Sequence, residues 1–541
     1  MSPQPSLRIS RALAAGTVLG AVVWLLLRQR YFYGWVDDDA FISFRYARNL
    51  ADGHGLVFNI GERVEGYTNF LWTVILALLY KLGADLPNAA RSLGALCSVA
   101  TVAVLLAFSR TRLFAAPDAL PPGARPWLVL VAPLVLCFSD AWAAWAAGGL
   151  ENTLSALLVS GGLLTYVRAT EAASESGFRH ALLMCAFALA LAVLNHPTNS
   201  VFLVPVVLHG LTRLRMCMAR GSMLAALLVF VAIVGAWTAW RLVYYGDLLP
   251  NTFYAKVGFT RFVWMRGLRY LLEILRALPF AYAVVVALGW LAVRRTDIRF
   301  PFALMGGACL LYTAYIVQVG GEQFPALRGL VVLLPLFALL VQRFAYELCR
   351  GGPGRTNAGQ SAVAMVVVLF VVAAHALPLY ASPRVRILDE ALRLGRTALS
   401  TTAALRLKEL LPPDTLFAHS GAGLIAFYTN FPWIDTLGLT DKHIARTPVE
   451  NMGRGAAGHE KGDGAYVWSR QPDFIMFPGY PISNRMPGTK GGRELFAIPQ
   501  FRATYRSVTM PFEFQGPQDD RPRSYVLHLW QRVGAPGPSS R

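Results

Sequence analysis

The chain has 541 residues, of which 55% are hydrophobic and 15% charged. This composition excludes an ordinary soluble enzyme and is typical of a polytopic membrane protein. The formal net charge of +19 does not indicate a nucleic-acid partner, because Lys and Arg are scattered at the ends of apolar runs. In such places they hold loops in the cytoplasm and contact anionic lipid. The six cysteines lie in or beside apolar segments, so neither a disulfide framework nor a cysteine metal site is expected.

The first predicted element is a membrane span over residues 12–27. Arg8 and Arg11 precede it, as in a signal peptide, but no small-residue cleavage site comes before Tyr31. The span is therefore expected to stay in the protein.

Three consecutive carboxylates, Asp37, Asp38 and Asp39, follow this span. Acids beside a bilayer are costly, so such a cluster indicates function. In one interpretation Asp38 or Asp39 caps a helix over 40–51. In the other, mutual repulsion raises at least one pKa toward the range useful to a general base. Capping explains one acid and not three, so a reaction site is favoured.

The helix over 40–51 is amphipathic, and we expect it to lie along the membrane surface. Its apolar and basic faces consist of Phe41, Phe44, Ala47 and Leu50, and of Arg45 and Arg48.

Further apolar segments predict a total of about eleven membrane-spanning helices. They cover residues 91–109, 127–145, 153–167, 180–194, 199–212, 222–242, 275–293, 301–318, 327–346 and 361–380. The stretch 70–82 is shorter than the roughly 20 residues that crossing requires, which favours a re-entrant or interfacial helix.

Basic residues collect in alternate loops only if 70–82 is left out of the span count. The positive-inside rule then places the N-terminus in the cytoplasm and the polar C-terminal region outside. Arg28 and Arg30, at the outer end of the first span, disagree with this pattern. On this topology the unusual loops share the outer side with the acidic triplet: 148–152, 195–197, 244–256 and 320–322.

The C-terminal region changes character, which divides the chain into a membrane domain, 1–381, and an external α/β domain, 382–541. A helix is expected over 391–411, and strands over 416–419, 433–436, 473–477 and 525–530. The domain either binds an acceptor glycan or serves as a structural lid. The glycines of the segment 420–427, SGAGLIAF, form an incomplete dinucleotide-loop pattern, which argues against nucleotide binding.

The segment DDAFISFRYARNLADGHGLVFNIGERVEGYTNFLW, residues 38–72, closely resembles the opening external loop of the glycosyltransferase C superfamily. Within it the chain resembles the bacterial polyprenyl-phosphate-arabinose-dependent arabinofuranosyltransferases, of the mycobacterial terminal type. Three further stretches resemble that branch: YYGDLLPNTFYAK (244–256), VGGEQFPALR (319–328) and DTLGLTDKHIAR (435–446). The chain departs from the family pattern at Asn195-His196-Pro197-Thr198 and at Glu322, where relatives carry Arg-Pro-Glu-like and Gly-Gly-Asp motifs.

The resemblance implies a glycosyltransferase C-type fold in a bacterial inner membrane, with the active site and the C-terminal domain in the periplasm. It implies transfer of D-arabinofuranose from a polyprenyl-phosphate donor to a glycan or glycoprotein acceptor. Asp38 maps onto the family's catalytic acid-base residue, Asp39 is expected to orient it or share its task, and Asp37 lies outside the motif. Another lipid-linked sugar, a hexose or aminoarabinose, is the alternative within this class. A lipid-linked-sugar transporter is the alternative outside it, although no internal repeat supports one.

Such a reaction needs positive charge for the leaving phosphate and polar groups for the sugar. Lys256 and Arg328 are the favoured cations, ahead of Arg261, Arg45 and Arg63, and each has lipid-headgroup anchoring as an alternative role. The other expected substrate-binding residues are Asp37, His54, Glu65, Tyr67, Asn69, Glu151, His196, Tyr245, Asn251, Tyr254, Glu322 and Asp441. Helix capping explains Glu151 equally well, and His54 fits a turn.

No ligand spacing specifies a metal, so no cofactor is assigned. A divalent cation held by Asp38, Asp39 and Glu151 or Glu322 remains an open alternative.

Overall fold

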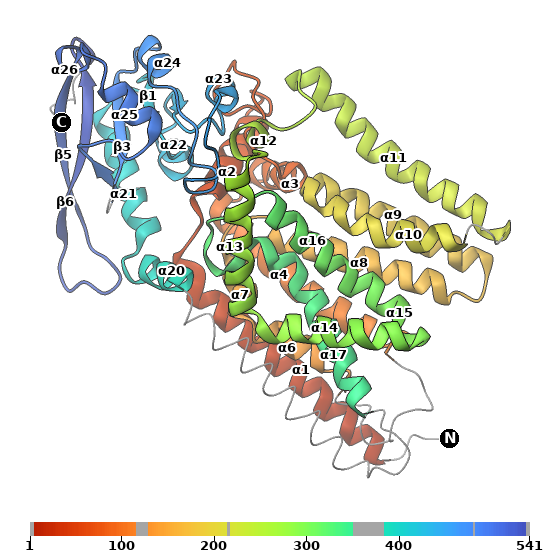
Figure 1. The fold of residues 1–541 in the computed structure, drawn as a ribbon. Helices are drawn as coiled ribbons and strands as arrows, with labels where there is room; N and C mark the ends of the chain where they lie inside the picture. Colours follow the sequence, from red (N-terminus) through yellow and green to blue (C-terminus); the bar gives the residue numbers. More distant parts are fainter. Residues whose placement is uncertain (1–4, 115–127, 214–216, 350–382, 480–481, 537–541) are drawn as a thin grey trace.

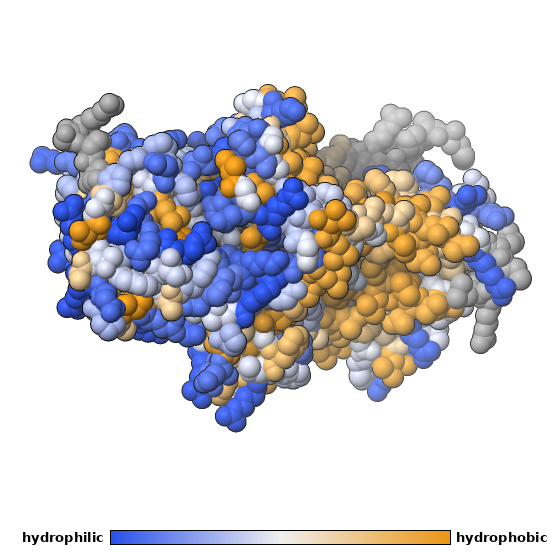
Figure 2. Space-filling view, turned by 90° about the horizontal axis from the view of Figure 1, so that it is seen from above, coloured by the Kyte–Doolittle hydropathy of each residue, from blue (hydrophilic) through white to orange (hydrophobic). Residues whose placement is uncertain are grey.

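The computed structural model describes residues 5–114, 128–213, 217–349, 383–479 and 482–536. A bundle of long helices forms one part, and a sheet with short helices lies beyond one end of the bundle (Figure 1). Seen from above, hydrophobic side chains cover the bundle and hydrophilic ones cover the sheet end (Figure 2). The chain is a polytopic helical membrane protein with a water-facing α/β part.

The helical part follows the chain in order. Its elements are α1 (Pro5–Tyr31), α2 (Asp38–Ala51), α3 (Phe70–Lys81), α4 (Leu86–Phe108), α6 (Val131–Cys137), α7 (Asp140–Ala147), α8 (Asn152–Glu171), α9 (Glu175–Asn195), α10 (Leu203–Arg213), α11 (Cys217–Tyr245), α12 (Asn251–Lys256), α13 (Arg261–Ala277), α14 (Pro279–Arg294), α15 (Thr296–Pro301), α16 (Gly307–Gln318) and α17 (Leu334–Cys349). Short 3-10 segments cover Phe32–Gly34, Pro197–Phe202 and Pro325–Leu333, and a π-helical turn covers Phe302–Gly306.

Fewer helices are long and apolar enough to cross a membrane than the eleven expected. Within the described ranges there are six, or up to seven if α13 and α14, bent by 93°, count as one span. The six cover Ala12–Gly34, Leu86–Phe108, Glu175–Asn195, Arg220–Tyr245, Thr296–Gln318 and Pro325–Cys349. The predicted span 153–167 corresponds to α8, and the predicted span 361–380 lies outside the described residues.

The predicted span 127–145 is broken, because its described part is two short helices, α6 and α7. They meet at Ser139, whose hydroxyl accepts the backbone N–H of Trp142 at the start of α7. Every residue of α7 from Ala141 to Ala147 is buried, so this run is apolar because it packs inside the protein. Asp140 of α7 pairs with Arg28 at 2.8 Å, which explains a basic residue at the outer end of the first span.

Two other predicted spans are also altered. The segment 199–212 begins as a 3-10 segment, Pro197–Phe202, and continues directly as the helix α10. The segment 275–293 is bent at Leu278, where Pro279 begins α14 and has no N–H to continue the preceding helix. The short helix expected at 70–82 is present as α3.

Helix α2 begins at Asp38, two residues earlier than expected, and Asp37 is its capping residue. The Asp37 carboxylate accepts the backbone N–H of Asp39 at 3.1 Å. The expected position on the membrane surface is wrong: nine of the residues in this helix are buried, Arg45 among them, because the C-terminal part packs over it.

The C-terminal part contains a six-stranded sheet in the order β2-β1-β3-β6-β5, with β4 paired to β3. Its strands are β1 (Phe417–His419), β2 (Trp433–Asp435), β3 (Phe474–Pro478), β4 (Ser483–Asn484), β5 (Tyr505–Phe514) and β6 (Arg523–Arg532). Strand β1 runs parallel to β2 and β3, and β6 runs antiparallel to β3 and β5. Its helices are α20 (Pro383–Arg393), α21 (Arg396–Leu410), α22 (Leu424–Thr429), α23 (Lys442–Arg446), α24 (Gly464–Ser469), α25 (Lys490–Phe496) and α26 (Phe501–Thr504).

The four predicted strands are confirmed, whereas the single helix predicted over 391–411 is two helices. Strand β5 was not predicted, since Pro511 interrupts its pattern; it lies at the sheet edge, where proline is tolerated.

Candidate functional site

A cavity of about 340 Å³ lies where the helical part meets the C-terminal part. Residues from five separated loops of the helical part line it, together with Leu439 and residues 457–459 of the C-terminal part. The sequence predicted that four of these stretches, which contain 148–152, 195–197, 244–256 and 320–322, lie on the same side of the membrane as the acidic triplet. Six predicted site residues line this cavity: Asp39, Glu151, His196, Lys256, Glu322 and Arg328.

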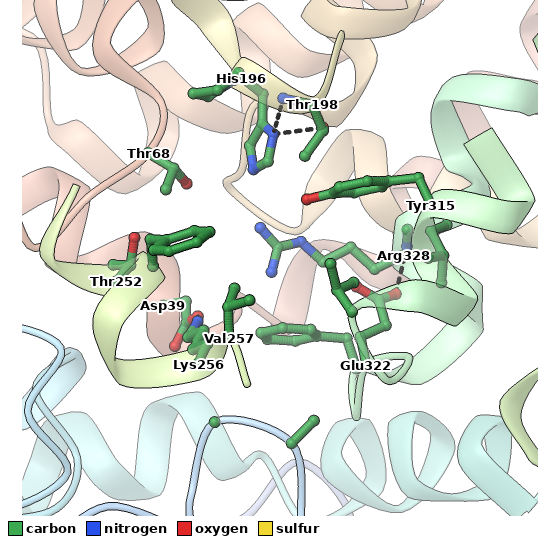
Figure 3. Close-up of a pocket in the computed structure, with 18 of the residues that line it drawn as sticks. Asp39, Thr68, His196, Thr198, Thr252, Lys256, Val257, Tyr315, Glu322 and Arg328 are labelled. Carbon is green, nitrogen blue, oxygen red and sulfur yellow. Dashed lines mark hydrogen bonds and ion pairs between the residues drawn. The ribbon is translucent and has the colours of Figure 1, made fainter. Parts of the chain in front are cut away.

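Arg328 occupies the middle of the cavity (Figure 3). Its guanidinium donates to Glu151 at 3.4 Å and lies 4.2 Å from the ring centre of Phe324. The two residues before it, Ala326 and Leu327, have φ angles of 49° and 51°. This left-handed backbone costs about 1–2 kcal/mol per residue for non-glycine residues. Such strain persists where the surrounding structure enforces it and is concentrated at functional sites.

Lys256 brings a second cation to the cavity from the end of α12. Its ammonium lies 3.6 Å from the Asp39 carboxylate, and both side chains keep partial access to solvent, 37% and 27%. The pair is therefore loose, and both groups are able to meet a ligand (Figure 3).

His196 contributes a neutral ring to the cavity. Burial lowers its pKa to about 4; nearby Glu151 opposes this, while Arg328 and Lys256 add to it. Its Nδ1 lies 2.7 Å from the hydroxyl of Thr198 and 3.4 Å from the backbone N of the same residue. Figure 3 shows the ring pointing toward Arg328, so its other nitrogen faces the cavity.

Two glutamates support the cations. Glu151 is buried and accepts from the side-chain amide of Asn69 at 2.7 Å as well as from Arg328. Glu322 accepts the backbone N–H of Gly329 and, at 3.4 Å, the hydroxyl of Tyr270. These contacts tie the turn before Arg328 to the segment after it.

The three acids of the triplet point in different directions. Asp37 caps α2 and is buried, and burial, helped by Asp39, raises its pKa, whereas nearby Arg328 opposes the rise. Asp38 faces the C-terminal part, where its carboxylate accepts the backbone N–H of Leu424 at 2.8 Å. Asp39 alone of the three lines the cavity.

Asp38 is exposed to solvent, although its carboxylate lies against the loop of the C-terminal part. Burial raises its pKa to about 6, Asp39 adds to the rise, and the N–H groups of Leu424 and Gly423 oppose it.

Arg45, expected to bind substrate, bridges the two parts instead. Its guanidinium donates to the carbonyl oxygens of Phe58, Ala426 and Phe431 at 2.8–2.9 Å and to Asn59 at 3.3 Å. The structure places it away from the cavity.

Glu65, Tyr67 and Tyr245 also lie outside the cavity lining. Glu65 is buried and accepts three contacts of 2.7–3.0 Å from Arg241 of α11. The hydroxyl of Tyr245 contacts that of Tyr67 at 3.1 Å and donates to the carbonyl of Leu56. These contacts fasten the first external loop to α11.

Asn251, Tyr254 and Asp441 connect α12 to the C-terminal part. The Asn251 amide donates to the carbonyls of Gly438, Leu439 and Asp441 at 2.8–3.2 Å. Asp441 caps α23, and Tyr254 lies under the guanidinium of Arg446.

Three further residues named from the sequence lie outside the lining. His54 is exposed in the turn after α2. Arg63 and Arg261 stack on Tyr244 and Phe262, respectively.

The sequence did not single out several residues that line the cavity. Tyr312 and Tyr315 lie in an apolar run that was interpreted only as a span, and His459 follows a glycine loop without any motif. Asn152 Oδ1 and Thr252 Oγ1 are buried lining atoms without a hydrogen-bond partner in the described structure, which suits them to bind a polar ligand.

The metal alternative gains no support from the geometry. Among the described residues, no three His, Cys, Asp or Glu side chains come close enough together to hold a metal ion.

Parts of the chain are similar to known proteins. Residues 389–527 match the model of a domain of unknown function, DUF8728. The chain is 29% identical to a terminal β-(1→2)-arabinofuranosyltransferase of Corynebacterium glutamicum, over 57% of this chain and 47% of that protein. It is 28% identical to the Mycobacterium tuberculosis protein of the same name, over 57% of this chain and 51% of that protein. The chain thus spans about half the length of these curated relatives.

The fold resembles a crystal structure of ArnT from Cupriavidus metallidurans bound to undecaprenyl phosphate. The TM-score is 0.56 at 14% sequence identity, and the match covers 97% of this chain and 99% of that chain. The resemblance predicted from the sequence is therefore confirmed: the chain is similar in sequence to terminal arabinofuranosyltransferases and in fold to ArnT.

Proposed function

We propose that this protein is a membrane glycosyltransferase that moves D-arabinofuranose from a polyprenyl phosphate to a glycan or glycoprotein acceptor. The sequence relatives are named for arabinofuranosyl transfer, and the ArnT structure with the similar fold holds undecaprenyl phosphate. We further propose that the protein lies in a bacterial inner membrane with the cavity and residues 382–541 on the periplasmic side, as the distribution of basic residues indicates.

The observation that carries the proposal is the presence of Arg328, Lys256 and Asp39 in one cavity. A sugar phosphate has an anionic leaving group, and the two cations supply positive charge where that group would rest. Asp39 supplies a carboxylate beside them. The cavity has room for a sugar, since about 340 Å³ lies within the range of small-ligand sites.

The reaction follows from these groups. The acceptor hydroxyl oxygen forms a bond to the anomeric carbon while the bond from that carbon to the phosphate oxygen breaks. The acceptor proton passes to the carboxylate, and polyprenyl phosphate leaves with the bonding electron pair. Positive charge develops on the sugar ring in the transition state, as in glycoside cleavage.

Between the two acids assigned to catalysis, the geometry favours Asp39 as the base. The sequence resemblance selected Asp38 with Asp39 as its helper, but only Asp39 lines the cavity, beside Lys256. A base must lie within hydrogen-bonding reach of the proton it removes. Glu151, Asn152 and His196 surround the space next to Arg328 and are suited to bind sugar hydroxyls or phosphate oxygens.

Purified protein supplied with a panel of polyprenyl-phosphate sugars tests the proposal. We expect transfer from the arabinofuranose donor, and a loss of about 10²–10⁴-fold in Asp39→Asn, the contribution typical of a general base. Asp52→Asn, an exposed acid at the other end of α2, is the matched control and should keep wild-type activity. Turnover of hexose donors alone would overturn the arabinose assignment, and turnover of no donor would overturn the transferase.

A further inference from the structure

The loop of residues 420–423 brings the C-terminal part against Asp38. The backbone N–H of Leu424, directly after this loop, donates to Asp38 Oδ1 at 2.8 Å. A Cβ atom at Gly423 would lie 2.4 Å from Asp38 Oδ2, so only glycine permits this approach. The carboxylate nevertheless stays open, because Asp38 is exposed and Gly421 beside it is half-buried. A second molecule can therefore reach Asp38 from the side of the C-terminal part.

His419 is the last residue of β1, immediately before this loop, and is 7% exposed. Its Nδ1 lies 2.7 Å from the backbone oxygen of Met476. A carbonyl oxygen only accepts hydrogen bonds, so Nδ1 carries the ring proton and Nε2 keeps a lone pair. Burial lowers the pKa of His419 to about 4, although the bond to Met476 opposes the fall, so the ring is neutral at neutral pH. Among the described residues, none forms a hydrogen bond with Nε2.

The lone pair of His419 and the carboxylate of Asp38 face the same space beside Gly421. A Cβ atom at Gly421 would lie 3.1 Å from His419 Nε2 and 3.7 Å from Asp38 Oδ2. The φ angle of Gly421 is not positive, so its backbone conformation does not require glycine. The missing side chain therefore matters for the space that it leaves open between the two groups.

The position of His419 in the sheet is typical of a ligand site. Strand β1 lies between β2 and β3 and runs parallel to both, so the chain leaves β1 toward one side and later returns on the other. In open α/β sheets, ligands bind beyond the carboxyl ends of the strands at such a reversal. His419 pairs with Met476 at this end of β1. The fold thus places Nε2 where sheets of this kind bind their ligands.

The charges divide the two sides of the acidic turn between different ligands. The Asp38 carboxylate and His419 Nε2 both accept hydrogen bonds, since neither carries a proton to donate. Two such groups side by side attract sugar hydroxyls, which donate, and repel a phosphate. The cations Lys256 and Arg328 lie in the cavity instead, on the side of Asp39. A sugar phosphate therefore fits the cavity, and an uncharged sugar with free hydroxyls fits the space next to Asp38.

We propose that the sugar that receives the transferred residue binds at this junction, defined by Asp38, His419 and Gly421. One of its hydroxyls donates to His419 Nε2, and a neighbouring hydroxyl is presented to the acids at the start of α2. This inference rests on the proposed function and deepens it. Asp38 directly precedes Asp39, which lines the cavity, so the two substrates meet at this turn from opposite sides. The C-terminal part then binds the receiving glycan and is not only a lid.

Steady-state transfer from a polyprenyl-phosphate arabinofuranose to methyl α-D-arabinofuranoside tests the site. We expect the KM for the arabinoside to rise about tenfold in His419→Ala, the loss of one well-placed hydrogen bond, while the KM for the lipid donor changes by less than about twofold. Gly421→Ala should raise the KM for the arabinoside at least as much, because its methyl group fills the open space. Gly488→Ala is the matched control, since a Cβ at that glycine meets no atom within 4 Å. An unchanged KM for the arabinoside in Gly421→Ala, or an equal rise in both KM values, would overturn the proposal.

Diethyl pyrocarbonate provides a readout independent of turnover, because it modifies accessible imidazole nitrogens that carry a lone pair. Mass spectrometry should detect modification of His419 in wild type, and less of it in Gly421→Ala or in wild type saturated with methyl α-D-arabinofuranoside. Exposed His54 is the internal control and should react equally in all samples. An unreactive His419, or one that the arabinoside does not protect, would overturn the site. A wild-type protein that consumes no lipid donor would overturn the proposed function, whereas the protection result would still decide whether this junction binds a sugar.

Discussion

Replacing Glu65 by Gln is expected to lower the free energy of unfolding by about 3–5 kcal/mol, the usual cost of removing one partner of a buried ion pair. Glu65 and Arg241 are 3% and 5% exposed and share three contacts of 2.7–3.0 Å. The variant leaves the guanidinium of Arg241 buried without a counter-charge, and this accounts for most of the loss.

The pair itself is expected to add little net stability. Burial raises the pKa of Glu65 even though Arg241 donates hydrogen bonds to it, so the desolvation of the carboxylate exceeds the attraction. The double variant Glu65→Met/Arg241→Met should therefore return to within about 1–2 kcal/mol of wild type, because apolar replacements of buried ion pairs are often neutral or stabilising.

Unfolding titrations in mixed micelles of a mild detergent and sodium dodecyl sulfate, followed by tryptophan fluorescence, measure these differences. Exposed Glu62→Gln is the control and should remain within about 0.5 kcal/mol of wild type. Strictly additive losses in the double variant would refute the reasoning. So would a Glu65→Gln protein of wild-type stability that fails to bind donor, since Glu65 would then act on substrate as the sequence suggested.

Three further predictions follow from the site and the interface. Arg328→Gln should reduce transfer by about 10²–10³-fold, because it removes a cation that the proposed function assigns to the leaving phosphate; an unchanged kcat in donor-saturated assays would contradict that assignment. Arg45→Met should lower the free energy of unfolding by about 1–3 kcal/mol, since it leaves the carbonyl of Phe431 without its donor, while those of Phe58 and Ala426 keep donors from Asn49 and Asn430. Half-buried Arg48→Met should cost less, and equal losses in detergent titrations would argue against the bridge. The raised pKa of Asp37 means that the folded protein holds this proton more tightly than the unfolded chain, so its stabilising contribution is present below the ordinary value of 3.8 and is lost as the pH rises toward neutral. Asp37→Asn, which keeps a capping oxygen, should flatten that dependence, and a pH-stability profile parallel to wild type would show that the carboxylate is not protonated in the fold.

Local patterns of the sequence were sufficient for the class of protein and for most single elements. Long apolar runs and alternating strand patterns depend on neighbours in the chain, and for this reason α4, α9, α11 and the four expected strands were predicted. The same patterns did not show where a span is broken: α6 and α7 meet at Ser139, and the run around Trp142 and Trp145 is enclosed by other helices. A hydropathy pattern does not distinguish a helix buried in protein from one buried in lipid.

The sequence was sufficient to predict which loops form the candidate site. It was less successful at predicting which of their side chains line the cavity. Asp39, Lys256 and Arg328 belong to motifs that the sequence already connected, and they line one cavity. Polar residues of the same motifs, such as Arg45 and Asn251, instead donate hydrogen bonds to backbone carbonyl groups of the C-terminal part. Their partners are nearly 190 or more residues away in the chain, so no local pattern reveals that their donors are already occupied.

The sequence by itself determined that three acids stand at the end of the first span, in a chain that resembles lipid-linked sugar transferases. It did not determine which of them faces the cavity. That was decided by the start of α2 at Asp38 and by the close approach of Gly423 from the C-terminal part. Adjacent helical residues diverge by about 100°, so the contact that holds Asp38 also selects Asp39 for the cavity. This choice depends on two surfaces that meet only in the folded protein.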